Sequence, residues 1–241
     1  MVRSLQIPLP LEPRRPDRFE DFVAGPNSAV LAAVRQLLEE PGQSLFLQGP
    51  EGSGKSHLLN ALCNAARSRG LAAFYIPLQR LPEEAAAGLE GLQALDLVCV
   101  DDIDRIAGKP VWEEALFRCF NEVRAARGRL VVASSTALGA MDLGLPDLAS
   151  RLAWGGQLKL QLPDDDQKRE ILRRRAQSLR IEVPDDVQRY LMTHGRRDLA
   201  SLLRAMERLK DAAFSDKRRI TVPLAREVLG DSRSGDEGAG R

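Results

Sequence analysis

The sequence predicts an α/β fold in which a parallel sheet, flanked by helices, is followed by a small all-helical domain. Three observations support this prediction. An apolar run, a glycine-rich loop and a helical pattern follow one another at 45–66, short apolar runs alternate with helical patterns up to residue 163, and only helical spacing follows. Strands that alternate with helices form parallel sheets with helices on both faces. We expect an extended arm at 1–16, a base domain at 17–163, a helical domain at 164–230 and a disordered tail at 231–241.

Composition indicates a globular, soluble chain, and its nearly balanced charge leaves room only for a local basic patch. Hydrophobic residues make up 44% of the 241 residues, and 35 Lys and Arg against 34 Asp and Glu leave a net charge of +1. Overall charge therefore gives no reason to expect binding to nucleic acid or to a membrane surface. Cys63, Cys99 and Cys119 lack metal-ligand spacing, so we expect buried free thiols. No apolar stretch is long enough to span a membrane, and a cytoplasmic protein is predicted.

The first sixteen residues are rich in proline, which is typical of extended backbone. Within them, Gln6-Ile7-Pro8-Leu9-Pro10-Leu11 places two leucines two positions apart. Both leucines can then enter one apolar groove of a partner, with Gln6 as a polar anchor. On these residues alone, a terminus without a function is an equal alternative.

A phosphate-binding loop is predicted at 49–56. Its residues match the pattern G-x-x-x-x-G-K-[ST] at every position, namely Gly49, Pro50, Glu51, Gly52, Ser53, Gly54, Lys55 and Ser56. The glycines allow successive N–H groups to face a phosphate, Lys55 would pair with the β and γ oxygens, and Ser56 would bind Mg²⁺. The flanking strand and helix patterns are those that the motif requires. We therefore predict a site for ADP or ATP with Mg²⁺.

An acidic strand end is predicted to complete this site. The apolar run at 97–100 ends in Asp101 and Asp102. A central parallel strand would bring both carboxylates to the sheet edge where ligands of open α/β sheets bind. Asp101 would hold the Mg²⁺ through water, and Asp102 would polarise an attacking water. An isolated acidic turn is more commonly a helix N-cap, but the upstream loop favours the metal interpretation.

The remaining patterns assign the other elements. We expect helices at 30–38, 82–94, 112–123 and 145–152, a buried strand at 72–76, a strand ending in hydroxyls at 130–135 and a last strand at 158–162. The second domain is predicted to contain four helices. They begin near residues 164, 184, 199 and 221, and Gly195 ends the second of them.

In this order, the phosphate loop, acidic strand, hydroxyl-ended strand, arginine-bearing helix and helical lid resemble the AAA+ ATPases. SLFLQGPEGSGKSHLLNAL and VDDID are similar to the DnaA replication-initiator branch. Two further stretches, LGLPDLASRLAWG at 143–155 and QIPLPL at 6–11, resemble the Hda family of regulatory inactivators of DnaA. The second stretch looks like that family's sliding-clamp-binding motif, which here consists of Gln6, Ile7, Leu9, Pro10 and Leu11.

The resemblance implies further site residues. Ser135 stands at the sensor 1 position, Arg151 at that of an arginine finger and Arg197 at sensor 2. Phe22, Val23 and Asn27 are expected to line an adenine pocket, and His57 to contact the nucleotide directly after the loop. Without the resemblance, either arginine would be interpreted as a surface cation or a salt-bridge partner.

The resemblance also implies a function. A nucleotide-bound AAA+ protein, held on the DNA-loaded sliding clamp, would use Arg151 to promote hydrolysis of ATP on DnaA and so prevent repeated initiation of replication. The expected partners are DnaA and the clamp, DNA mainly through the clamp, and a second copy of the chain. No DNA-binding domain follows the lid, so direct recognition of an origin sequence is not expected. Asp102 and Ser135 replace the Glu and the longer Asp or Asn found in many AAA+ proteins, and weak intrinsic turnover is expected.

Three other functions fit the motifs. An autonomous ATPase of the helicase-loader or clamp-loader kind would turn over free ATP and require Asp102. A small-molecule P-loop kinase would transfer phosphate to an acceptor, although such enzymes usually insert a shorter lid within the sheet region. A binding module that only sequesters the initiator would keep its inhibition after Arg151→Ala.

Overall fold

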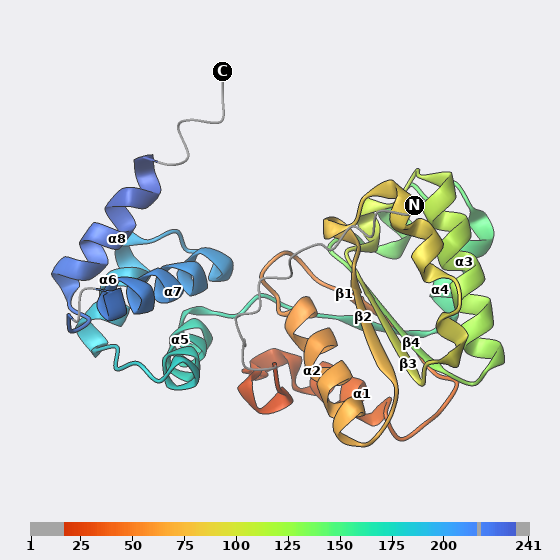
Figure 1. Cartoon of the computed structure of the whole chain (residues 1–241), viewed down its shortest axis with the longest axis horizontal. Coiled ribbons are helices and arrows are strands. Elements are labelled where there is room, and N and C mark those ends of the chain that lie inside the picture. Colours follow the sequence, from red (N-terminus) through yellow and green to blue (C-terminus); the bar gives the residue numbers. More distant parts are fainter. Residues whose placement is uncertain (1–16, 216–217, 235–241) are drawn as a thin grey trace, which may run out of the picture.

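The computed structural model describes residues 17–215 and 218–234, which form a base with a central sheet and a separate cluster of helices (Figure 1). The predicted clamp-binding residues Gln6, Ile7, Leu9, Pro10 and Leu11 lie outside the described residues. Within the described ranges, no helix is both long enough and apolar enough to cross a lipid bilayer.

The sheet has five parallel strands, as the sequence predicts. Their order is β2-β3-β4-β1-β5, with β1 (Ser44–Gln48), β2 (Ala73–Pro77), β3 (Leu97–Asp101), β4 (Arg129–Ser134) and β5 (Gly156–Lys159). Every residue of β3 and β4 is buried. Because all strands point the same way, their carboxyl ends share one edge, here called the carboxyl edge, and their starts share the opposite amino edge.

Helices cover both faces of the sheet (Figure 1). The helices α1 (Ser28–Gln36) and α2 (Lys55–Ser68) pack on one face, and α3 (Pro110–Ala125) and α4 (Pro146–Trp154) on the other. Each face has its own apolar cluster, so the base has two cores separated by the sheet. Cys63, Cys99 and Cys119 are buried and free in these cores, as predicted.

The helical lid consists of α5 (Asp165–Leu179), α6 (Asp185–His194), α7 (Leu199–Ser215) and α8 (Val222–Ser234). It has a third apolar cluster of its own, which includes Leu172, Leu191 and Met206. The helix α5 begins with a capping box. The Asp164 side chain accepts a hydrogen bond from the Gln167 N–H, and the Gln167 side chain accepts one from the Asp164 N–H. The last helix continues to Ser234, whereas the sequence predicts a tail from residue 231. Propagation of an existing helix explains this extension, since each added residue adds a hydrogen bond.

Other predicted elements are also corrected. The expected helix at 82–94 forms the 3₁₀ segments Glu83–Leu89 and Leu92–Ala94, separated at Gly91, whose φ of 79° no α-helix accommodates. The strand β2 is only partly buried, whereas a buried strand is predicted there, because β2 lies at the sheet edge and Phe74 is 49% exposed. The last strand ends at Lys159, so Leu160 and Leu162 follow it. The remaining 3₁₀ segments are Phe19–Asp21, Gly25–Asn27, Leu78–Arg80, Ile103–Arg105 and Leu138–Ala140.

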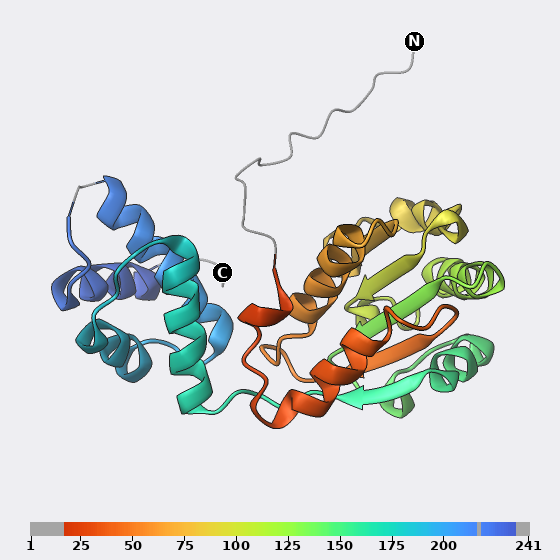
Figure 2. The ribbon, with the colours of Figure 1, turned by 90° about the horizontal axis from the view of Figure 1, so that it is seen from below.

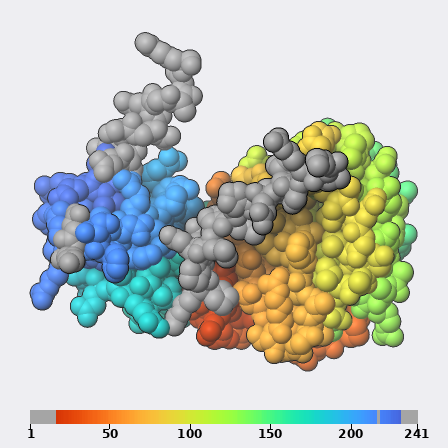
Figure 3. All heavy atoms as spheres, in the orientation of Figure 1, coloured from red at the N-terminus to blue at the C-terminus, as the bar shows by residue number. Residues whose placement is uncertain are grey.

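The first described residues join the lid to the base, as Figures 2 and 3 show in red. From α5, the Arg174 guanidinium donates to the carbonyl of Glu20 at 2.6 Å and to that of Phe22 at 3.3 Å. The Asn27 amide donates to the Gln161 carbonyl at 3.0 Å and accepts from the Gln161 N–H at 2.8 Å. These contacts fix the segment before α1 against the chain that leads into the lid.

Candidate nucleotide site and arginine finger

The phosphate loop runs from β1 into α2 with two residues in the left-handed region. Gly52 has a φ of 82° and Gly54 a φ of 96°, which other residues rarely adopt. A Cβ at Gly54 would lie 2.7 Å from the Phe22 ring, and one at Gly49 would lie 2.6 Å from the Ser53 hydroxyl oxygen. The glycines are therefore required both by the turn and by the close approach of neighbouring side chains.

The loop presents donors that the chain itself does not satisfy. Within the described ranges, the N–H groups of Gly52 and Gly54 donate to no acceptor, and the buried Ser53 hydroxyl has no hydrogen-bond partner. The buried Lys55 ammonium donates to the carbonyls of Gly49 at 2.7 Å and Pro50 at 3.3 Å. Pro50 and Glu51 are exposed. Free N–H groups beside a lysine fit a phosphate group, the ligand that the sequence predicts for this loop.

Asp101 ends β3 fully buried beside this loop. Its carboxylate accepts from the Tyr75 hydroxyl at 2.8 Å and from the Asp102 N–H at 3.0 Å. Burial and the Asp101 charge hold the pKa of Tyr75 well above its usual range, while interaction with Ser56 acts in the opposite direction. Tyr75 thus holds the carboxylate of Asp101, one of the two predicted metal ligands, by a hydrogen bond. No motif in the sequence marks Tyr75.

Asp102 has a φ of 60°, a strained conformation for a residue with a side chain. It begins the 3₁₀ turn that carries the chain from β3 toward α3. Burial, followed by the neighbouring Asp101 and Asp104 carboxylates, raises the pKa of Asp102 above the ordinary aspartate value. The carboxylate therefore binds protons more readily than a free aspartate, which suits a group that interacts with water.

Asp104, which sequence reasoning also missed, joins the ends of β3 and β4. One carboxylate oxygen accepts from the Ser134 hydroxyl and the Ser135 N–H, both at 3.1 Å, and the other accepts from the Ser135 hydroxyl at 2.7 Å. Burial alone would raise the pKa of Asp104, but these bonds lower it overall. Ser135, the predicted sensor 1, is therefore held in place beside Asp101 and Asp102.

The lid approaches the loop through the start of α7. A Cβ at Gly52 would lie 3.9 Å from the Leu199 Cβ and 3.8 Å from a Leu162 methyl group. Arg197 is two residues before Leu199 and has an exposed side chain. The Asp198 carboxylate accepts from the Ser201 N–H at 2.8 Å and caps the first turn. The structure thus brings the segment carrying the predicted sensor 2 to the phosphate loop.

The segment before α1 borders the other side of the loop. The Phe22 ring stacks on His57 with centroids 6.0 Å apart, and Val23 beside it is half-buried. The His57 ring contacts the Arg18 carbonyl at 2.9 Å and the Asp17 carboxylate at 3.4 Å. Asn27 is buried, and its amide is engaged by Gln161. Of the predicted adenine-pocket residues, Phe22 lies directly at the loop.

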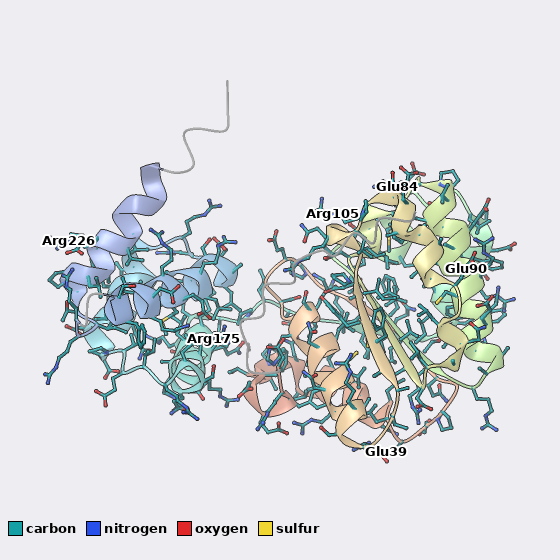
Figure 4. All side chains as sticks on the ribbon, viewed as in Figure 1. Glu39, Glu84, Glu90, Arg105, Arg175 and Arg226 are labelled. Carbon is teal, nitrogen blue, oxygen red and sulfur yellow. The ribbon has the colours of Figure 1, made fainter. Side chains whose placement is uncertain are left out.

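A cavity of about 310 Å³ opens between this segment and the lid. Asp17, Asp21 and His57 line it from the base, and residues of α5 and α7 line it from the lid. Arg175, labelled in Figure 4, pairs there with Glu207 of α7. His57, which stacks on Phe22 beside the phosphate loop, therefore also lines this cavity.

Arg151 lies apart from these groups. It is on α4, with its guanidinium carbon 4.1 Å from the centroid of the Trp154 ring, and α4 ends directly before β5. This places it near the amino edge, whereas the phosphate loop follows the carboxyl end of β1. The five-residue β1 separates the two edges by about 16 Å. The structure brings together Lys55, Asp101, Ser135 and the Arg197 segment, but not Arg151.

Within the described ranges, no three His, Cys, Asp or Glu residues form a cluster that could hold a metal ion. A Mg²⁺ ion held by Ser56 and by Asp101 through water would need phosphate oxygens to complete its ligands. Such a sparse protein ligand set fits a metal that arrives with a nucleotide.

Comparison with known proteins identifies the two domains. The bacterial DnaA ATPase domain matches residues 14–159, and the lid domain of Hda matches residues 165–229. Domain III of the Thermotoga maritima replication initiation protein DnaA is 25% identical, with a TM-score of 0.77 over 92% of this chain and 98% of that one. AMPPCP-bound DnaA from Aquifex aeolicus is 22% identical, with a TM-score of 0.69 over 92% and 69%.

The Thermotoga maritima RuvB Holliday junction branch migration motor is 21% identical, with a TM-score of 0.65 over 94% of this chain and 76% of that one. At such identity the likeness to RuvB and to the Aquifex protein concerns the fold. The DnaA match extends over more than half of the chain and contains the phosphate loop, Asp101 and Arg151. The chain therefore belongs to the bacterial DnaA ATPase family of AAA+ proteins, and it carries the lid domain of Hda.

Proposed function

We propose that this chain is an AAA+ regulator that, held on the DNA-loaded sliding clamp, stimulates hydrolysis of ATP bound to DnaA and so represses initiation of chromosomal replication. The placement of Arg151 carries the proposal. It lies near the amino edge, about one strand length from the chain's own phosphate loop. A guanidinium there can stabilise a transferring γ-phosphoryl group only on another molecule. The Hda lid match supports DnaA as that molecule.

The chain's own nucleotide, ADP or ATP, would bind at the carboxyl edge. The free N–H groups at Gly52 and Gly54 would hold its phosphates, with Lys55 turning from the Gly49 carbonyl toward them. Bound Mg²⁺, held by Ser56 and Asp101, would neutralise phosphate charge. Arg197 would contact the phosphates from the lid, and Phe22 and Val23 would border the base. The lid position would then depend on the bound nucleotide.

Within that site, Asp102 and Ser135 would act on the γ-phosphate side. Asp102 would orient a water molecule, and the Ser135 hydroxyl, which donates to Asp104 in the structure, would turn to donate to a phosphate oxygen instead. Both side chains are short, so we expect slow hydrolysis of the chain's own nucleotide. On this proposal its nucleotide mainly sets the surface that meets DnaA, and the hydrolysed ATP belongs to the partner.

In this proposal the chain acts on the DNA-loaded clamp, through a predicted contact made by Gln6, Ile7, Leu9, Pro10 and Leu11. A proline-rich extended segment loses little entropy when it docks into a groove. The clamp would place the chain near DNA and would raise its effective concentration beside DnaA. A cytoplasmic location is part of the proposal.

A single-round assay tests it. ATP pre-bound to DnaA is followed in the presence of DNA-loaded clamp, with the native chain, Arg151→Ala, Arg151→Lys and a chain lacking residues 1–11. The native chain should accelerate hydrolysis, and Arg151→Ala should abolish the acceleration. The truncated chain should lose it when clamp is limiting. Unchanged hydrolysis with the native chain would overturn the proposal, and inhibition retained by Arg151→Ala would indicate a sequestering module instead.

An autonomous ATPase is the second candidate, because the carboxyl edge assembles Lys55, Asp101, Asp102 and Ser135 in one chain. It predicts steady turnover of free ATP without DnaA and its loss in Asp102→Asn. Measuring phosphate release from the chain alone distinguishes this candidate from the first.

A further inference from the structure

Trp154 is the exposed aromatic residue nearest to the candidate finger. Its side chain is 57% exposed, although it ends a helix whose Leu148 and Leu152 are buried in the base. A single exposed apolar side chain is common on protein surfaces and does not by itself mark a site. The surroundings of this indole, however, indicate a use.

Two guanidinium groups from different helices share this indole. The guanidinium carbon of Arg151, one turn earlier on α4, lies 4.1 Å from the ring centroid, and that of Arg124, from the last turn of α3, lies 4.8 Å away. Both distances are within the range of cation–π interactions. In the described ranges, neither Arg151 nor Arg124 forms an ion pair with a carboxylate. Two guanidinium groups are thus held beside one ring, and neither is part of an ion pair.

The backbone beneath Trp154 is closely packed. A Cβ at Gly155 would lie 2.7 Å from the Ser44 carbonyl oxygen, so the chain after the indole passes directly against the start of β1. The Gln157 amide donates to the Leu152 carbonyl at 2.9 Å and covers the end of α4. The backbone that carries the indole is therefore held in place. An arginine that stacks on this indole loses less side-chain entropy on binding a partner than an arginine without such a contact.

We propose that Trp154, Arg151 and Arg124 form one triphosphate-facing surface, in which Trp154 is a positioning residue for Arg151 and Arg124 supplies a second positive charge. This rests on the proposed function, since it concerns how Arg151 reaches ATP on DnaA. The indole holds the Arg151 guanidinium away from carboxylates and near its working position. The γ- and β-phosphates of the partner's ATP carry several negative charges, so a second guanidinium strengthens docking.

The contact itself is tested without DnaA. In the ¹⁵N-labelled full chain, the Nε–Hε signal of Arg151 should be displaced by the ring current of the indole. Trp154→Leu, which keeps an apolar side chain, should abolish the displacement, and Trp154→Phe should keep part of it. An unchanged signal in Trp154→Leu would overturn the positioning role.

The single-round assay then tests the surface. Trp154→Leu should lower the maximal rate of DnaA-bound ATP hydrolysis about two- to fivefold with little change in the half-saturating concentration, and Trp154→Phe should restore it. Arg124→Gln should mainly raise the half-saturating concentration and weaken its salt dependence. Arg69→Gln, which removes the exposed arginine that follows α2 and pairs with Glu39, is the charge control. Native rates in Trp154→Leu, or equal effects of the two Arg→Gln variants, would contradict the surface.

These outcomes separate the two proposals. If the native chain does not stimulate hydrolysis of ATP bound to DnaA, the proposed function is wrong. The role assigned to the surface of Trp154, Arg151 and Arg124 is then wrong as well. Stimulation that depends on Arg151 but not on Trp154 or Arg124 leaves the proposed function intact and overturns the inference alone.

Discussion

The charged side chains of the two candidate sites, which lie at opposite edges of the sheet, differ in their partners. At the carboxyl edge, the charged side chains pair within the chain, namely Lys55 with loop carbonyls, Asp101 with Tyr75, and Asp104 with Ser135, although the loop keeps free N–H groups. At the amino edge, Arg124 and Arg151 rest on an exposed indole and form no ion pair within the described ranges. Pairing within the chain fixes a site before its ligand arrives. Unpaired cations on the surface suit a ligand that another molecule brings.

One helix connects the edges. The nine-residue α4 is about 13 Å long, begins after the loop beyond β4 and ends beside Trp154 at the start of β5. At its beginning, the buried Glu113 carboxylate of α3 accepts from the N–H groups of Gly108 at 2.7 Å, Gly144 at 3.1 Å and Leu145 at 2.7 Å. This carboxylate therefore fixes where the finger helix begins.

The largest expected effect comes from Glu113→Gln. Its amide can accept only part of these three bonds and directs N–H groups toward N–H donors, so the free energy of unfolding should fall by about 3 kcal/mol. Urea unfolding measures the change. Glu114→Gln, at the exposed neighbouring position, is the control. A stability equal to that of the control would show that the carboxylate does not hold α4.

A second prediction contrasts the edges directly. Lys55→Met should weaken binding of a fluorescent ADP analogue about 10- to 100-fold, because a charged hydrogen bond contributes about 1.5–3 kcal/mol. Arg151→Ala should bind the analogue as the native chain does, since its guanidinium lies near the other edge. Fluorescence titration at constant Mg²⁺ provides both affinities, and thermal unfolding checks the fold of each variant. If Arg151→Ala lost affinity comparably, the proposed separation of the edges would be wrong.

Much of the carboxyl edge could be predicted from sequence because its main groups are close in sequence to the loop or the strand end. The eight loop residues and the carboxylates after β3 follow fixed local patterns, and parallel topology then places them together. Tyr75, Asp104 and Glu113 could not be predicted in the same way. Asp104 meets Ser135 across 31 positions and Glu113 meets Gly144 across 31, and only the folded chain determines these pairs.

The amino edge was predicted only through resemblance. A single arginine on a short helix carries no local signal for phosphate chemistry, and the contact with Arg124 depends on the packing of α3 against α4. The strand errors have a related cause. Leu160 and Leu162 alternate like a strand, but among the described residues β5 pairs with β1 alone, and β1 ends opposite Lys159.

A third prediction concerns Asp104→Asn, which should lower the free energy of unfolding by about 1–2 kcal/mol at pH 7. The hydrogen bonds that lower the pKa of Asp104 stabilise the fold above the ordinary aspartate pKa and are lost as pH falls through the lowered value. The difference between native and variant should therefore shrink on acidification, which urea unfolding at pH 7 and pH 3.5 measures. Asp96→Asn, which replaces an acceptor at the amino edge, provides the comparison. A pH-independent difference would exclude ionisation of Asp104 as the cause.

The smallest expected effect tests whether pairing at the carboxyl edge extends to the segment before α1. Burial by itself would lower the pKa of His57, but the Asp17 carboxylate, the Arg18 carbonyl and Asp21 raise it above 6.5 overall. A raised folded-state pKa adds stability that is fully present below pH 6.5 and is lost as pH rises through the raised value. Native protein should therefore exceed His57→Gln in unfolding free energy at pH 6 by more than at pH 8, and the change should be below about 1 kcal/mol because the pair is partly exposed. Urea unfolding at both pH values measures it, and His194→Gln gives the background from the other histidine. A larger difference in unfolding free energy between native protein and His57→Gln at pH 8 than at pH 6 would mean that His57 is held neutral. Its pairing with Asp17 would then contribute nothing to fixing Phe22 against the phosphate loop.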